Sequence, residues 1–224
     1  MSPSESVRRA AGAAVALMAV FPAAVIVLNL VQLGHYDPAA DAISLLALGR
    51  GGLALNVAFI LGGAAALTAA WVLHRSVTGA VAGPLLIGFF GCTSVVSGLV
   101  HTAPDNAPAT TASNVHQLAG VLGFLAVIAA MFVFARRFRR DPAWRNYARP
   151  TLAWAIAAAV TFASIPFAPD ALFGLAQRAH IATSISWLIV TMIRARSLAA
   201  RQEPAGPPPA AASQDASLNA TADA

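Results

Sequence analysis

Charge is scarce in this sequence. Asp, Glu, Lys and Arg make up only 10% of the 224 residues, whereas ordinary soluble domains contain about 25%. Lysine is absent, so all 14 basic residues are Arg. Cysteine occurs once, as Cys92 inside an apolar stretch, which excludes an internal disulfide and predicts a small core residue. Water is therefore not the main solvent of this chain, and the usual soluble classes are excluded.

Apolar residues, by contrast, make up 58% of the chain and gather in blocks. A helix of about 20 residues crosses the roughly 30 Å hydrocarbon core of a bilayer, and the blocks have that length. A β-barrel would instead show short alternating segments. The sequence predicts an all-α integral membrane bundle of six helices, which occupies residues 10–195. The expected spans are Ala10–Leu33, Gly52–Leu73, Ala80–His101, Asn114–Ala135, Thr151–Phe167 and Leu175–Ile193.

Arginine is distributed unequally between the two sides of the predicted membrane domain. Arg50 and Arg178 lie on one side, and the other twelve Arg lie on the opposite side. Because Arg accumulates in cytoplasmic loops, the arginine-rich side is predicted to be cytoplasmic. Both termini then lie in the cytoplasm. They comprise residues 1–9 and the segment 196–224, whose Pro, Ala and small polar residues predict a disordered tail.

Six of the arginines lie in the stretch from Arg136 to Arg149, where Trp144 and Tyr147 are expected at the level of the lipid headgroups. This pattern is typical of a topology determinant on the membrane surface, and recognition of anionic lipid is the alternative. The net charge of +5 does not indicate nucleic acid, because the basic residues lie in short loops beside apolar blocks. We therefore expect the lipid bilayer as a partner and no nucleic acid. The oligomeric state stays open.

Polar and titratable residues gather on the side that is poor in arginine. An unpaired polar group in hydrocarbon costs several kcal/mol, so such residues should face one another inside the bundle. Ser97 and His101 are four residues apart, as are His180 and Ser184, and each pair is expected on one helix face. An outward-facing polar pocket is one interpretation, and wet helix ends without a function are the other. The candidate binding residues are Asp37, Ser44, Asn56, Ser97, His101, Asp105, His116, Asp170, Arg178 and His180.

Several short motifs carry a family resemblance. They are Tyr36-Asp37-Pro38, Ile43-Ser44-Leu45-Leu46, Asn56, Gly62, Pro104-Asp105 with His116, and Gly174-Leu175-Ala176-Gln177-Arg178. Over residues 10 to 195 the chain resembles the bacterial and archaeal membrane proteins grouped as the domain of unknown function 998 family. The resemblance implies a multi-pass protein with six spans in the prokaryotic cell membrane, and it implies no particular activity.

Three functions are compatible with these features. The favoured one is binding or transport of a small solute or a lipid headgroup, in which Arg178 pairs with Asp170 or holds an anion. Pairing with Asp170 is the expected state. A structural or accessory subunit, whose Ala-rich and Gly-rich faces bind a partner membrane protein, is an alternative.

A membrane-embedded, metal-dependent hydrolase is the other alternative. Neutral imidazoles and a carboxylate suffice for zinc, and an open coordination position would activate water. The Ser97 and His101 pair is similar to the pattern in zinc hydrolases of the alkaline ceramidase and progestin receptor superfamily. This chain departs from that pattern, because it has six spans instead of seven and Ser184 instead of a second His after His180. The metal candidates are His101, His116, His180 and Asp105, although no cofactor is the favoured expectation.

Overall fold

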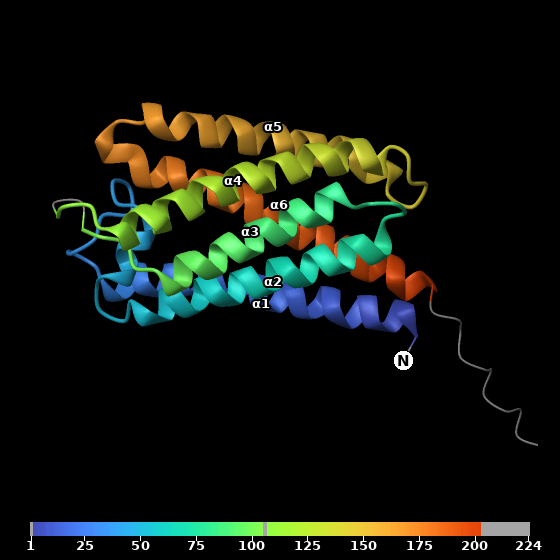
Figure 1. Cartoon of the computed structure of the whole chain (residues 1–224), viewed down its shortest axis with the longest axis horizontal. Coiled ribbons are helices and arrows are strands. Elements are labelled where there is room, and N and C mark those ends of the chain that lie inside the picture. Colours follow the sequence, from blue (N-terminus) through green and yellow to red (C-terminus); the bar gives the residue numbers. More distant parts are fainter. Residues whose placement is uncertain (1, 105–106, 203–224) are drawn as a thin grey trace, which may run out of the picture.

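Six long helices run alongside one another in the computed structural model, which describes residues 2–104 and 107–202 (Figure 1). All six are long and apolar enough to cross a membrane. The described residues contain no strand, so the predicted all-α fold of a multi-pass membrane protein is confirmed. The helices are α1 (Pro3–Val31), α2 (Leu53–Ser76), α3 (Ala82–Leu99), α4 (Thr111–Phe138), α5 (Ala148–Ser164) and α6 (Phe173–Gln202).

Side-chain caps mark where α1 and α4 begin. At the start of α1 the Ser2 hydroxyl accepts a hydrogen bond from the Glu5 amide at 3.1 Å, and Pro3 occupies the first helical position. At the start of α4 the Thr110 and Ser113 side chains bond each other's backbone amides in a capping box. These caps satisfy amide groups that a helix cannot bond internally.

The helices form a closed ring in which each packs against the next and α6 packs against α1, while α2 also touches α6. The beginning of α1 and the end of α6 lie at the same end of the bundle (Figure 1). We call this the termini end, and it also carries the connections 77–81 and 139–147. The opposite far end carries the connections 32–52 and 165–172 and the described residues 100–104 and 107–110.

Glycine permits α2 and α3 to approach closely. A Cβ atom at Gly63 would lie 2.6 Å from the carbonyl oxygen of Gly91, and one at Gly98 would lie 2.6 Å from the carbonyl oxygen of Asn56. Side chains at these positions would therefore force the two backbones apart.

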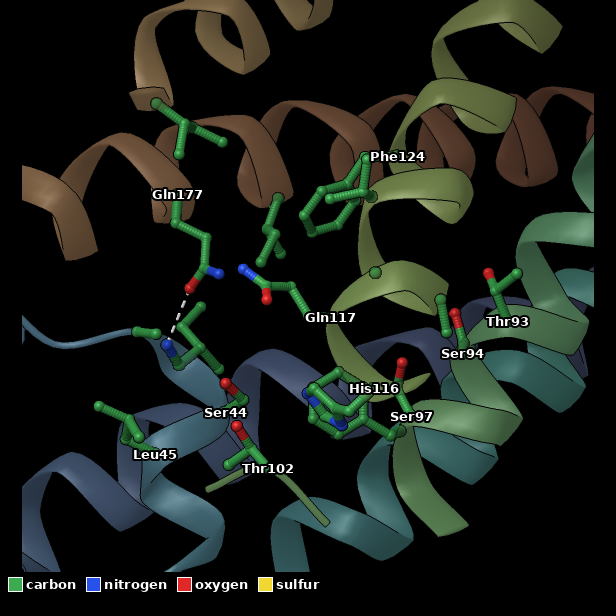
Figure 2. A pocket seen from close by; sticks show the side chains of 18 of the residues that line it. Ser44, Leu45, Thr93, Ser94, Ser97, Thr102, His116, Gln117, Phe124 and Gln177 are labelled. Carbon is green, nitrogen blue, oxygen red and sulfur yellow. Dashed lines mark hydrogen bonds between the residues drawn. The ribbon is translucent and has the colours of Figure 1, made fainter. Parts of the chain in front are cut away.

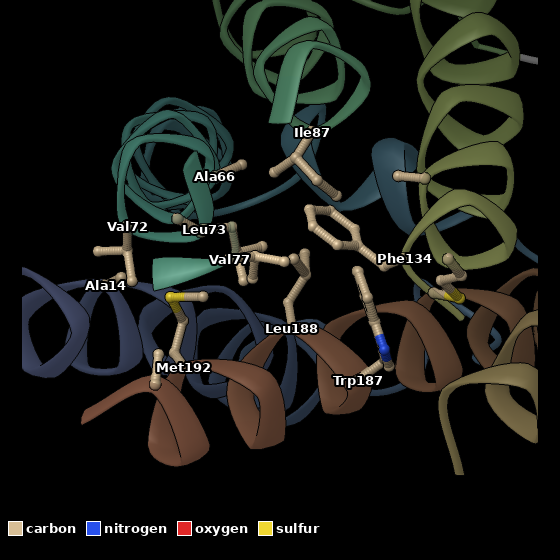
Figure 3. Packing of buried hydrophobic residues seen from close by; sticks show 14 of the residues in the cluster. Ala14, Ala66, Val72, Leu73, Val77, Ile87, Phe134, Trp187, Leu188 and Met192 are labelled. Carbon is tan, nitrogen blue, oxygen red and sulfur yellow. The ribbon is translucent and has the colours of Figure 1, made fainter. Parts of the chain in front are cut away.

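The half of the bundle toward the termini end is filled by large side chains (Figure 3). Phe138 stacks on Trp144 with 4.6 Å between ring centroids, and the Trp144 indole N–H donates to the carbonyl oxygen of Ser76 at 3.1 Å. Trp144 is 0% exposed and Tyr147 is 7% exposed. Both rings therefore face the protein interior and not lipid, because a ring partner and a backbone acceptor hold Trp144 there. Their expected depth at the level of the headgroups stays a prediction.

Helix α6 extends beyond the predicted end of the membrane domain. Residues 196–202, which were assigned to a disordered tail, are helical. They are rich in Ala, Leu, Arg and Gln, which favour helix, and Ala199 is buried in the same core as α1. The boundary of the tail at residue 196 is therefore wrong. The rest of the predicted tail, residues 203–224, lies outside the described residues.

Candidate functional site

A cavity of about 750 Å³ occupies the bundle toward its far end. All six helices contribute to its wall, together with the short 3₁₀ helix η1 (Ile43–Ala47) and the connection between α3 and α4. Apolar side chains dominate the wall, among them Phe21, Phe59, Phe90 and Phe124. No charged side chain occurs among the described lining residues. The polar side chains are Ser44, Thr93, Ser94, Ser97, Thr102, Ser113, Asn114, His116, Gln117 and Gln177.

Hydroxyl groups follow α3 along one side of the cavity (Figure 2). The Thr93 and Ser94 hydroxyls both donate to the carbonyl oxygen of Phe90, each at 2.9 Å. Ser97 lies one turn further toward the far end and is only 5% exposed. Because these residues share one face of α3, their oxygens form a short polar strip in an apolar wall.

His116 lies in the first turns of α4 and lines the cavity. Its Nδ1 is 2.9 Å from the carbonyl oxygen of Val100, the residue that follows α3. A carbonyl oxygen can only accept, so Nδ1 carries the hydrogen. The ring also meets Phe59 edge-on, with 6.0 Å between ring centroids. In the neutral imidazole Nε2 is then an acceptor.

The connection from residue 36 to residue 47 folds over the far end of the cavity, and we call it the cap. Ile43 and Leu46 anchor it, since their side chains are 3% and 0% exposed. Ser44 and Leu45 line the cavity. The Ile43 amide donates to Oε1 of Gln177 at 2.8 Å, which ties the cap to α6 (Figure 2).

The start of α6 holds the rest of the cap through backbone bonds. The Gly174 and Leu175 amides donate to the carbonyl oxygens of Ala40 and Ala39 at 3.1 and 3.0 Å. A Cβ atom at Gly174 would lie 2.4 Å from the carbonyl oxygen of Asp41, so the cap reaches the helix only because this residue is glycine. The free amides of a helix start thus find acceptors within the protein.

Arg178 completes the contact between α6 and the cap. Its guanidinium donates to the carbonyl oxygen of Asp41 at 2.9 Å and to the Tyr36 hydroxyl, and it lies over the Tyr36 ring. Burial raises the pKa of the Tyr36 hydroxyl, although the neighbouring Arg178 partly offsets this. The described residues show no ion pair between Arg178 and Asp170, so the predicted pairing is wrong. Its guanidinium instead donates to Asp41 and Tyr36 of the cap and to the carbonyl oxygen of Gly174 in α6.

Asp37 and Asp41 shape the cap and do not line the cavity. The Asp37 carboxylate accepts from the Ala39 amide at 2.8 Å, and the Asp41 carboxylate accepts from the Asp37 amide at 2.8 Å. Such bonds stabilise turns.

His180 lies in α6 directly behind the cavity wall and is 0% exposed. Its Nδ1 bonds the carbonyl oxygen of Ala158 at 3.0 Å, and its ring packs against Phe124 and Phe162, both of which line the cavity. Ser184 is buried beside it on the same side of α6, as their spacing predicts. Within the described chain, neither Nε2 of His180 nor Oγ of Ser184 has a hydrogen-bond partner.

The other predicted residues lie apart from the cavity wall. Helix α3 ends at Leu99, so His101 lies in an exposed connection and not on one helix face with the buried Ser97. The predicted pairing of these two residues is wrong, because the backbone turns extended after Leu99. Asn56 is half-buried in α2, and Asp170 is exposed.

No metal set is evident in the part of the chain that the structure describes, where no three His, Cys, Asp or Glu side chains come together. Asp105 lies outside the described residues. Of the candidate histidines, one lines the cavity, one lies behind its wall and one is in a connection.

Thr93, Ser94, Gln117 and Gln177 line the cavity but were not among the predicted site residues. Helical spacing could have identified the first two, since Phe90, Thr93, Ser94 and Ser97 recur at one helix face. Gln177 lies within a motif that carried the family resemblance, yet only the fold places it beside residue 43.

Comparisons with curated proteins and with solved structures gave no match. A family model described as "Protein of unknown function (DUF998)" matches residues 10–194. The matched region includes the six helices except the ends of α1 and α6, and it contains the cap with its contacts to α6. The chain therefore belongs to the DUF998 family of proteins of unknown function.

Proposed function

We propose that the cavity binds a small, uncharged and largely apolar molecule that carries a hydrogen-bonding group. The observation that carries this proposal is an apolar cavity of about 750 Å³ with no charged residue among its described lining. Ligand pockets usually measure about 300–1,000 Å³ and combine apolar walls with a few polar groups. An ion would be costly in such a site, because no opposite charge would compensate its desolvation.

The polar lining supports a ligand with a hydroxyl or amide group. Nε2 of His116 can accept a hydrogen bond, since Nδ1 already bonds Val100. Ser97 lies on the neighbouring helix and offers a hydroxyl. Behind Phe124, the unpartnered Nε2 of His180 and Oγ of Ser184 provide a second polar layer.

The arrangement of α4 and α5 favours entry from the bilayer. Toward the far end α4 diverges from α5 (Figure 1). Exposed residues line the cavity on both sides of this gap. Gln117 and Val121 belong to α4, Ala163 belongs to α5, and Pro166 follows α5. The arginine asymmetry of the sequence predicts that this half lies in the outer leaflet. The ligand would then be a membrane-dissolved neutral amphiphile, which the protein binds or carries.

Photo-crosslinking tests the proposal. The probe is a long-chain alcohol with a diazirine in its chain, compared with the matching carboxylic acid, in membranes that contain the protein. We expect the alcohol to label cavity residues such as Phe124 and Ile181 several times more than the acid does. A Cβ atom at Gly120 meets nothing within 4 Å and Gly120 lines the cavity, so Gly120→Leu should narrow the cavity and reduce this labelling several-fold.

Ala157→Leu is the matched control, because Ala157 is exposed on α5. It should leave the labelling unchanged. Labelling confined to lipid-facing residues, or equal labelling in both variants, would overturn the ligand site and favour a structural subunit.

A further inference from the structure

A second hollow lies between α1 and α6 at the termini end. It measures about 320 Å³ and is lined by Arg8, Val15, Ile193, Arg196, Ser197 and Ala200. Two guanidinium groups therefore border it, with no carboxylate among its described lining residues. The nearby Glu5 carboxylate pairs with Arg9 at 2.6 Å. We call this hollow the α1–α6 groove.

Arg196 reaches across the groove to α1. A Cβ atom built at Gly12 would lie 3.8 Å from Cζ of Arg196, an ordinary van der Waals distance, so the guanidinium packs over this position of α1. Within residues 2–104 and 107–202, the Arg196 side chain has no hydrogen bond or ion pair. An exposed guanidinium in this position can bind an oxyanion with two parallel hydrogen bonds.

The groove is lined by charged residues near the termini end and by apolar residues further into the bundle. Arg8 lies seven residues before Val15, which corresponds to about 10 Å along α1. Arg196 lies three residues after Ile193, or about 4.5 Å along α6. Since α1 starts and α6 ends at the termini end, the charged groups form the mouth of the groove and Val15 and Ile193 form its inner part. The same sequence of layers, charged and then apolar, occurs in a phospholipid.

We propose that the α1–α6 groove binds an anionic phospholipid, with its headgroup phosphate on Arg196 at the mouth of the groove and its acyl chain along Val15 and Ile193. Anionic lipids are abundant in the cytoplasmic leaflet, where the arginine asymmetry places this end. This site is separate from the far-end cavity, so either proposal can fail without the other.

Native mass spectrometry of the detergent-purified protein tests this proposal, with phosphatidylglycerol and phosphatidylcholine as probes. We expect the protein to retain phosphatidylglycerol preferentially, and Arg196→Gln to reduce that retention at least threefold. Arg201→Gln is the matched control, because Arg201 lies on the same helix outside the groove and should change retention little. Equal melting temperatures in phosphatidylcholine would show that both variants fold.

Three outcomes would overturn the assignment. Equal loss in both variants would indicate diffuse charge attraction. Displacement of the lipid by an equal concentration of glycerol 1-phosphate would indicate a site for a soluble phosphate. Loss in Arg136→Gln but not in Arg196→Gln would move lipid recognition to the stretch between Arg136 and Arg149.

Discussion

At the scale of single residues, the motifs that carry the family resemblance have structural partners. Tyr36 at one end of the cap meets Arg178, and Ile43 meets Gln177, although more than 130 residues separate each pair. Gly174 leaves the space that these contacts require. The sequence showed that these residues were unusual, but Arg178 was expected to pair with an acid. Its acceptors are instead two backbone carbonyl oxygens and the Tyr36 hydroxyl. A residue pattern does not show which backbone carbonyl groups a side chain will meet.

The contacts of Arg178 predict that Arg178→Gln loosens the cap. Loss of its bonds to Asp41 and Tyr36 should lower the free energy of unfolding by about 1–3 kcal/mol. Hydrogen exchange should increase over residues 36–47 and change little elsewhere. Arg50→Gln is the control, since Arg50 is the other arginine at this end and is exposed. Equal exchange in the two variants would contradict the role assigned to Arg178.

At the scale of elements, apolar blocks predicted the six helices because crossing the bilayer requires about 20 apolar residues. Their ends were less predictable. Helix α6 continues to Gln202 on helix-forming residues outside the membrane pattern, and α3 stops at Leu99 before His101. The cap was not predicted, because tertiary contacts rather than local periodicity hold η1 in place. Helix spacing correctly placed His180 and Ser184 together but could not show that Phe124 and Phe162 separate His180 from the cavity.

Two adjacent glycines of α2 give a matched test of helix packing. A Cβ atom at Gly63 would meet the α3 backbone at 2.6 Å, whereas one at Gly62 meets nothing within 4 Å. Gly63→Ala should therefore destabilise the protein by about 1–3 kcal/mol. Gly62→Ala should be neutral or stabilising, because alanine favours helix by up to about 1 kcal/mol over glycine. Equal melting temperatures of the two variants in detergent would contradict the close approach of α2 and α3.

At the scale of the whole molecule, the two halves of the bundle differ in kind. Toward the termini end, rings such as Phe134, Phe138 and Trp187 fill the interior. Toward the far end, a mostly apolar wall with a few polar side chains encloses a cavity beneath the cap. The sequence predicted the polar bias of the far half but treated its histidines as one group. In the fold these histidines are separate. His116 of α4 lines the cavity, His180 of α6 lies behind the cavity wall, and His101 lies in the exposed connection after α3.

A hollow far half that takes up a neutral amphiphile is the central proposal for this protein. The direct measurement is the rate at which N-ethylmaleimide modifies single cysteines in a Cys92→Ala background. Ser97→Cys lies in the cavity wall, and Ala155→Cys lies in the filled half. We predict that Ser97→Cys reacts, that dodecanol or Gly120→Leu slows it at least threefold, and that Ala155→Cys stays unreactive. Equal rates at the two positions, or no protection by dodecanol, would contradict the account.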